Sequence, residues 1–244
     1  MKIAFVGDSY CWHINKGSWP FIVAETFNAE IILAGASGQC FYHSFQDLLG
    51  VVDEADYIIF CVTGSGRIAN YHRLPLNTGM IEDYYENKSC AKKYADTYKL
   101  PRVQLRQIMN AARDYYKNLV DFSYHRMAQH GMLMMVDELM IKQKKKCIWF
   151  SCYEDSMSND YFNHFIPKSG PLGNIALYNI SHNELIFQGM TDKEVRQATL
   201  YDTRKNHLNE ENNKRLANLI IDTITLKQLS PGIIKMQNYF EVLK

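Results

Sequence analysis

The chain has 244 residues, of which 47% are hydrophobic and 22% charged, a balance typical of a soluble globular protein. This composition excludes a disordered chain, and no run approaches the roughly 18 apolar residues that a membrane span requires. With 27 basic and 26 acidic side chains, the net charge of +1 gives no electrostatic reason to expect a nucleic-acid partner. The N-terminus has no signal-peptide pattern, so we expect a cytoplasmic protein that does not act on membranes.

The cysteine and histidine spacing argues against a metal centre. Six cysteines lie at positions 11, 40, 61, 90, 147 and 152, and none forms a Cys-x-x-Cys pair. Neither they nor the histidines at 13, 43, 72, 164 and 182 have the spacing of metal ligands. We therefore expect reduced structural thiols, structural or rim histidines, and no metal site.

Strand and helix signals alternate from the first residue. Lys2–Val6 is a short apolar run, Glu30–Leu33 is a second strand, and Tyr57–Val62 is apolar throughout. Between them, Pro20–Phe27 and Ser44–Val52 have helical patterns. Strands that are apolar on both faces and joined by helices favour a parallel sheet covered on both sides.

The second half of the chain adds helices and two more strands. Val103–Lys145 is helical in pattern, with the tyrosines between 115 and 124 dividing it into two helices. Lys146–Cys152 is a fourth strand, Glu184–Phe187 a weaker fifth, and Asn209–Leu226 the last helix with Asn209 as its N-cap. The predicted apolar stripe comprises Leu105, Ile108, Met109, Ala112, Tyr116, Leu119, Met127, Met135 and Leu139.

We predict one α/β domain over residues 1–244, a three-layer sandwich with a short parallel sheet. Two segments, at about 71–100 and 154–183, read as irregular insertions that are functional or carry local structure. Both follow strand carboxyl ends, and their aromatic residues either rim a pocket or pack the loops onto the domain. The tyrosines of the first segment are Tyr71, Tyr84, Tyr85, Tyr94 and Tyr98.

Two motifs that lie far apart in the sequence contain candidate catalytic residues. Gly7-Asp8-Ser9 stands at the carboxyl end of the first strand, where open α/β sheets place ligands. A serine there can present both its hydroxyl and its N–H to an oxyanion. Near the other end, His207 precedes the last helix and is a candidate base for that hydroxyl.

With these blocks the chain resembles the SGNH (GDSL-like) hydrolase family. Gly7-Asp8-Ser9 matches the first block, Ala36-Ser37-Gly38 looks like the second, and Cys61-Val62-Thr63-Gly64 lies where the third begins. His207 matches the last block, and the spacing between blocks also fits. The resemblance implies a flavodoxin-like strand order and a serine esterase that needs no cofactor.

The resemblance also implies a role for each matched residue. Ser9 is the nucleophile, His207 the general base, and the N–H groups of Ser9 and Gly38 form the oxyanion hole. The substrate is a carboxylic ester, such as an O-acetyl group on a carbohydrate. A small-molecule or carbohydrate partner is therefore expected, and a homo-oligomer stays open.

The chain departs from the family pattern at two places. The third block normally ends Gly-x-Asn-Asp, but here it reads Gly64-Ser65-Gly66-Arg67, so the asparagine that donates to the oxyanion is missing. Arg67, Asn70 or the backbone at Gly66 are its candidate replacements, although Arg67 could equally pair with a surface carboxylate. The family's aspartate lies three residues before the histidine. Here the nearest acid is Asp202, five residues before it, so a triad and a Ser-His dyad both stay open.

Two alternatives accompany this hypothesis. Residues 64–69 fit the G-x-G-x-x-A dinucleotide fingerprint, which must open a helix, yet Pro75 follows closely and Asn77-Thr78-Gly79 reads as a turn. The missing asparagine also favours a catalytically silent domain that keeps the fold as a ligand-binding or assembly module.

Overall fold

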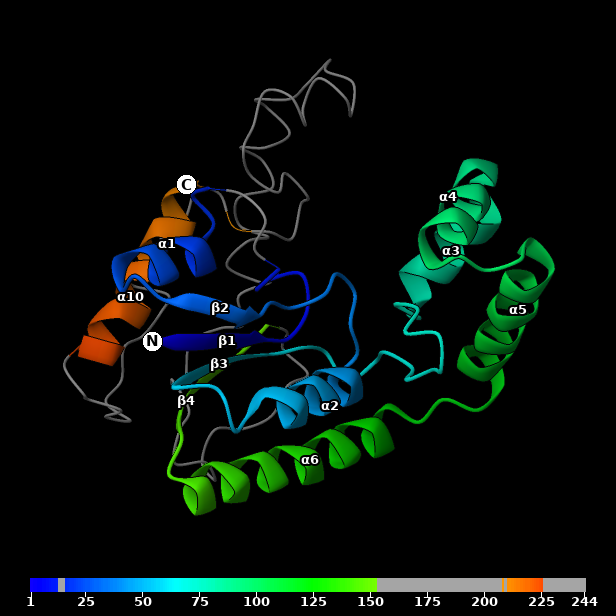
Figure 1. Ribbon diagram of the computed structural model, residues 1–244. Helices are drawn as coiled ribbons and strands as arrows, with labels where there is room; N and C mark the ends of the chain where they lie inside the picture. The colour runs from blue at the N-terminus through cyan, green and yellow to red at the C-terminus, as the bar shows by residue number, and fades with distance from the viewer. Residues whose placement is uncertain (13–15, 153–207, 209, 226–244) are drawn as a thin grey trace, which may run out of the picture.

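A four-stranded parallel sheet forms the centre of the computed structural model, which describes residues 1–12, 16–152, 208 and 210–225 (Figure 1). Its strands are β1 (Lys2–Val6), β2 (Glu30–Leu33), β3 (Tyr57–Val62) and β4 (Lys146–Ser151). The order β2-β1-β3-β4, parallel throughout, confirms the predicted α/β class and agrees with a flavodoxin-like arrangement. The predicted fifth strand, Glu184–Phe187, lies outside the described residues.

Helices cover both faces of this sheet, which confirms the three layers. Helices α1 (Trp19–Thr26) and α10 (Glu210–Thr225) lie on one face, and α2 (Phe41–Val51) and α6 (Phe122–Gln143) on the other (Figure 1). Successive residues of a strand point to opposite faces. In β1, Ile3 and Phe5 therefore join the α1/α10 core, whereas Ala4 and Val6 join the α2/α6 core.

Three further helices form a unit beside the sheet with a hydrophobic core of its own. They are α3 (Thr78–Glu86), α4 (Lys88–Tyr98) and α5 (Arg102–Asn118), shown beyond the end of α2 in Figure 1. Leu105 and Met109 are fully buried in this core, and Tyr84, Tyr94 and Tyr98 pack against it. Burial raises the pKa of Tyr94 to about 12. These three tyrosines therefore pack the helical unit.

The segment 71–100, predicted as an irregular insertion that is functional or carries local structure, does carry local structure, because most of it forms α3 and α4. Asn77 caps α3 by accepting a hydrogen bond from the Met80 N–H, and Asn87 caps α4 by accepting from the Ser89 N–H. Such caps start helices whose side chains show little apolar periodicity. The second segment predicted as irregular, 154–183, lies outside the described residues.

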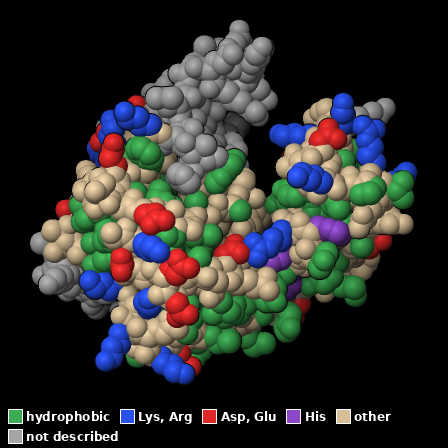
Figure 2. Space-filling view, in the orientation of Figure 1, with side chains coloured by type: hydrophobic (Ala, Val, Ile, Leu, Met, Phe, Trp, Pro, Cys, Tyr) green, Lys and Arg blue, Asp and Glu red, His purple; other side chains and the backbone are tan. Residues whose placement is uncertain are grey.

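The predicted division of the 103–145 region into two helices is confirmed. Asp121 caps α6 by accepting hydrogen bonds from the N–H groups of Ser123 and Tyr124. The predicted apolar stripe is wrong at three positions, because Leu119, Met127 and Met135 are 73%, 66% and 56% exposed. Helix α6 packs instead through Leu133, Val136 and Met140. Figure 2 shows hydrophobic side chains on the surface over this helix.

Element boundaries differ little from the prediction. Helix α2 begins at Phe41, three residues before the predicted start, and α1 begins at Trp19 rather than Pro20. Helix α10 begins at Glu210, and the predicted cap Asn209 lies outside the described residues. The six cysteines are free thiols, as expected. Among the described residues, no helix combines the length and apolarity needed to cross a membrane.

Candidate active site

The turn after β1 presents Ser9 at the carboxyl edge of the sheet. Gly7 has φ +143°, and a Cβ there would lie 2.4 Å from the carbonyl oxygen of Cys61, so the position requires glycine. Asp8 is fully buried, and its Oδ1 accepts a hydrogen bond from the Tyr10 N–H at 3.1 Å. This Asx turn fixes the backbone on both sides of Ser9, which is partly exposed.

The second matched block lies directly against this turn. The Ala36 N–H donates to the Gly7 carbonyl at 3.1 Å, and the Gly35 N–H donates to the Cys11 carbonyl at 3.2 Å. Gly38 has φ +74°, and a Cβ there would lie 2.2 Å from the Cβ of Pro75. The conformation of the loop after β2 therefore depends on glycine at position 38.

Arg67 joins the third block to the first two. Its Nη1 donates to Asp8 Oδ2 at 2.9 Å and to the carbonyl oxygen of Gln39 at 2.8 Å. The Thr63 hydroxyl donates to the same Asp8 oxygen at 2.9 Å. The expectation that Arg67 pairs with a surface carboxylate is wrong, since its partner Asp8 is fully buried and the Arg67 side chain is only 12% exposed.

Asn70 stabilises its own loop. Its Nδ2 donates to the carbonyl oxygens of Leu74 at 2.7 Å and Ile68 at 3.3 Å, and its Oδ1 accepts from the Leu74 N–H at 3.0 Å. Ile68 then pairs with Leu76 in an antiparallel bridge, and the next helix starts only at Thr78. The fingerprint at residues 64–69 therefore opens no helix, and the dinucleotide-binding alternative is wrong.

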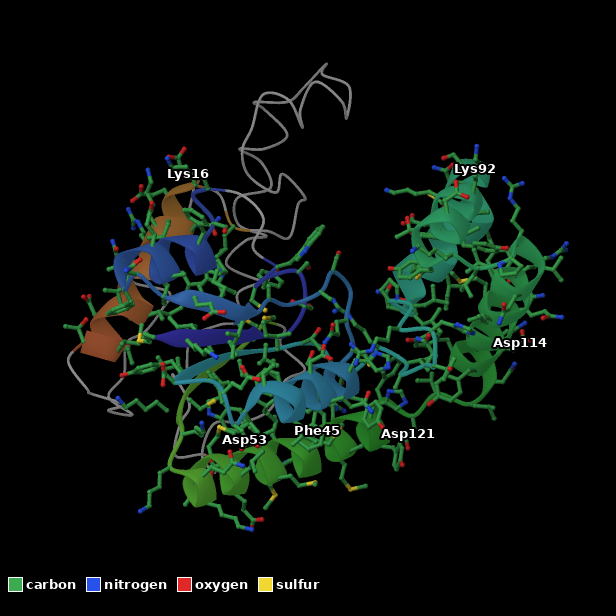
Figure 3. All side chains as sticks on the ribbon, viewed as in Figure 1. Lys16, Phe45, Asp53, Lys92, Asp114 and Asp121 are labelled. Carbon is green, nitrogen blue, oxygen red and sulfur yellow. The ribbon has the colours of Figure 1, made fainter. Side chains whose placement is uncertain are left out.

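Three side chains from α5 and α6 hold the other side of this loop. Gln129 Nε2 donates to the Thr63 carbonyl at 2.7 Å, and His125 Nδ1 lies 3.1 Å from the Ser65 carbonyl oxygen. The Tyr116 hydroxyl lies 2.5 Å from the Gly66 carbonyl oxygen. Sequence reasoning missed these residues, which flank the α5–α6 junction marked by Asp121 in Figure 3. Their one sequence signal is the four-residue spacing of His125 and Gln129, which places both on one helix face.

The predicted base and its acidic partner, His207 and Asp202, lie outside the described residues. Leu208, the next residue along the chain, is 4% exposed and belongs to the same core cluster as Tyr10 and Cys11. Its carbonyl oxygen accepts a hydrogen bond at 2.9 Å from Asn213 of α10.

One histidine near the second block forms a structural contact. His43 Nδ1 lies 3.3 Å from the sulfur of Cys40, and both side chains are buried. Burial raises the pKa of the Cys40 thiol, and burial together with the charge of Arg73 lowers the pKa of His43. Both groups are therefore neutral near pH 7, which agrees with the structural role expected of His43.

Comparison with known proteins gives structural similarities alone. No family model and no curated protein sequence matches the chain. Among solved structures, a putative lipolytic protein of the G-D-S-L family from Desulfitobacterium hafniense aligns over 63% of this chain at 12% identity and a TM-score of 0.33. This chain spans 61% of that protein's length. An acetyl xylan esterase, AlAXEase, aligns over 92% of this chain and 100% of its own at 12% identity and a TM-score of 0.33.

Proposed function

We propose that the protein is a hydrolase of carboxylic esters in which Ser9 is the nucleophile. The observation that carries this proposal is the bridge formed by Arg67, whose Nη1 joins Asp8 of the Ser9 turn to the Gln39 carbonyl beside Gly38. Three loops distant in sequence are thereby assembled around one serine at the carboxyl edge of a parallel sheet. This edge is where α/β folds bind substrates.

In the proposed mechanism, His207 takes the proton of the Ser9 hydroxyl as the oxygen attacks the ester carbonyl. The N–H groups of Ser9 and Gly38 stabilise the tetrahedral oxyanion, and its collapse expels the alcohol and leaves an acyl-serine. Water activated by His207 then releases the acid. Asp202 orients His207, and the ester is an O-acetyl group on a carbohydrate. Leu208, the residue after the proposed base, belongs to the same core cluster as Tyr10, the residue after Ser9, which supports this placement of the base.

Covalent labelling tests the nucleophile. A fluorophosphonate probe reacts with an activated serine, so we expect mass spectrometry to find the label on Ser9 between about pH 6 and 9, where some neutral histidine base is available. The Ser9→Ala variant should lose labelling, whereas Ser123→Ala, at an exposed serine on α6, should retain it. Absence of label from the wild-type protein, or label on another residue, contradicts the assignment.

The role of Asp202 requires a separate variant. If its carboxylate accepts a hydrogen bond from His207, Asp202→Asn should lower kcat by about 10⁴-fold, because the amide favours the wrong tautomer of the imidazole. Steady-state turnover of a chromogenic acetate ester measures this effect, and circular dichroism confirms that the variant folds. Near-native turnover of Asp202→Asn would indicate that Ser9 and His207 act as a dyad without Asp202.

One observation favours a second candidate, a catalytically silent ligand-binding module. The amide of Asn70, chemically the nearest replacement for the missing asparagine, is used within its own loop. If the protein shows neither labelling nor turnover, this candidate replaces the esterase.

A further inference from the structure

On one side of the loop after β3, side chains of α5 and α6 contact the carbonyl oxygens of the loop. Three side chains of α5 and α6 contact three carbonyls of residues 63–66: Gln129 contacts Thr63, His125 contacts Ser65, and Tyr116 contacts Gly66. Gln129 is only 2% exposed, and burial raises the pKa of Tyr116, which keeps its phenol protonated as a donor. We call these three side chains the carbonyl clamp.

The contacts of His125 define its tautomer. A carbonyl oxygen can only accept, so Nδ1, which faces Ser65, carries the proton. Nε2, on the other side of the ring, lies 2.6 Å from the hydroxyl oxygen of Tyr115. Contacts therefore run from Tyr115 through His125 to the peptide between Ser65 and Gly66.

The clamp also fixes the direction of the amide groups in this loop. In a trans peptide the C=O and the following N–H point in opposite directions. Because the Ser65 and Gly66 carbonyls face α6 and α5, the N–H groups of Gly66 and Arg67 point away from these helices. The side chains of Thr63 and Arg67 reach Asp8 beside Ser9, so the loop lies between the clamp and the Ser9 turn.

Position 66 itself leaves little room for a side chain. A Cβ at Gly66 would lie 3.3 Å from the ring of Phe122, the first residue of α6. An asparagine here would require that ring to shift. The α5–α6 junction thus fills the space beside the position at which the resembled family carries its oxyanion donor.

We propose that Tyr116, His125 and Gln129 are positioning residues that aim the Gly66 N–H at the oxyanion formed on Ser9, in place of the missing asparagine. This inference rests on the proposed esterase function. It assigns a catalytic purpose to the α5–α6 junction, which acts through the backbone of the loop and does not touch the substrate.

Three variants each remove one side chain's contact with the loop: Tyr116→Phe, His125→Leu and Gln129→Met. The first also removes the contact of the Tyr116 hydroxyl with the Leu76 carbonyl, 3.0 Å away. Since loss of one oxyanion donor lowers kcat by about 10² to 10³-fold, misdirecting that donor should lower kcat by about 10- to 100-fold. KM should change by less than about twofold, because the contact strengthens only in the transition state. Turnover of a chromogenic acetate ester measures both constants.

Two comparisons separate positioning from general support of the fold. His125→Asn keeps an N–H near the place of Nδ1, so it should restore kcat to within about threefold of wild type, whereas His125→Leu should not. A boronic acid, which forms a tetrahedral adduct on serine, should inhibit each impaired variant more weakly by the same factor as kcat/KM falls. Arg126→Ala, at an exposed neighbour of His125, is the matched control and should keep wild-type kinetics.

The outcomes distinguish this inference from the function on which it rests. Turnover that stays at wild-type level in all three folded variants, or a rise in KM alone, overturns the inference and leaves the esterase intact. An equal loss in His125→Asn and His125→Leu also overturns it. If wild-type protein neither turns over an ester nor reacts with the fluorophosphonate, the inference falls together with the proposed function.

Discussion

At the scale of single residues, the most consequential contact joins Arg67 to Asp8. A fully buried carboxylate requires compensation, and here the guanidinium and the Thr63 hydroxyl share its Oδ2 while its Oδ1 accepts from the Tyr10 N–H. The same aspartate therefore shapes the Ser9 turn and anchors the loop after β3. A substitution of Arg67 consequently acts on stability as well as on the site.

A double-mutant cycle measures the contribution of this pair to stability. Arg67→Ala leaves the Asp8 carboxylate buried without its cation, so we expect it to lower the free energy of unfolding by about 3 kcal/mol. Asp8→Asn combined with Arg67→Ala should recover much of that loss, because an amide at position 8 can still accept from the Tyr10 N–H. Urea unfolding of the four proteins measures the coupling. If the losses in unfolding free energy of the two single variants simply add in the double variant, the interaction between Asp8 and Arg67 contributes nothing to stability.

The sequence predicted the residues of this site unevenly, for a physical reason. Gly7 and Gly38 could be placed because they stand in the blocks that match the resembled family, and the structure shows that the backbone conformation and close packing at both positions require glycine. The carbonyl clamp could not, because His125 and Gln129 lie about 60 residues from the loop and contact backbone oxygens, which every residue carries. The partner of Arg67 could not be predicted, because Asp8 lies 59 residues away in the sequence and only the fold shows that it is buried.

At the scale of secondary structure elements, prediction succeeded where burial imposes a pattern. Strands β1, β2 and β3 have the predicted bounds because both faces of the sheet are covered and their sequences are apolar. Helices α3 and α4 were missed because they are small, polar and aromatic, and bury few residues each. Their starts depend on local caps rather than on periodicity.

The caps provide a test at this scale. Asn77→Ala removes the acceptor for the Met80 N–H, which lies 2.8 Å from Asn77 Oδ1, and should lower stability by about 1 kcal/mol. Asn77→Asp retains an acceptor and should cost much less. Asn118→Ala, at an exposed position at the end of α5, is the control. Thermal unfolding ranks the three variants, and equal losses for Asn77→Ala and Asn77→Asp would contradict the capping role.

At the scale of the whole molecule, the described residues form three hydrophobic clusters rather than one. Two lie on opposite faces of the sheet and share its strands, so we expect them to unfold together. The third joins α3, α4 and α5 to Leu74 and Leu76 of the loop before α3, and it contains no residue of β1 to β4. The helical unit is joined to the sheet by the loop after β3 and by the junction between α5 and α6 (Figure 1).

This arrangement predicts that the helical unit opens separately from the sheet. Leu105 is 1% exposed in the third cluster, so Leu105→Ala should cost about 2 to 5 kcal/mol there. Hydrogen exchange should then quicken in α3, α4 and α5 while the amides of β1 and β3 stay protected, because local openings follow cooperative units. Ile59→Ala, at a fully buried position of the central strand β3, should quicken exchange in the sheet and the helical unit alike, since it lowers the global stability. If Leu105→Ala exposes β1 and β3 as much as the helices, the three clusters unfold as one, and the helical unit has no independent opening.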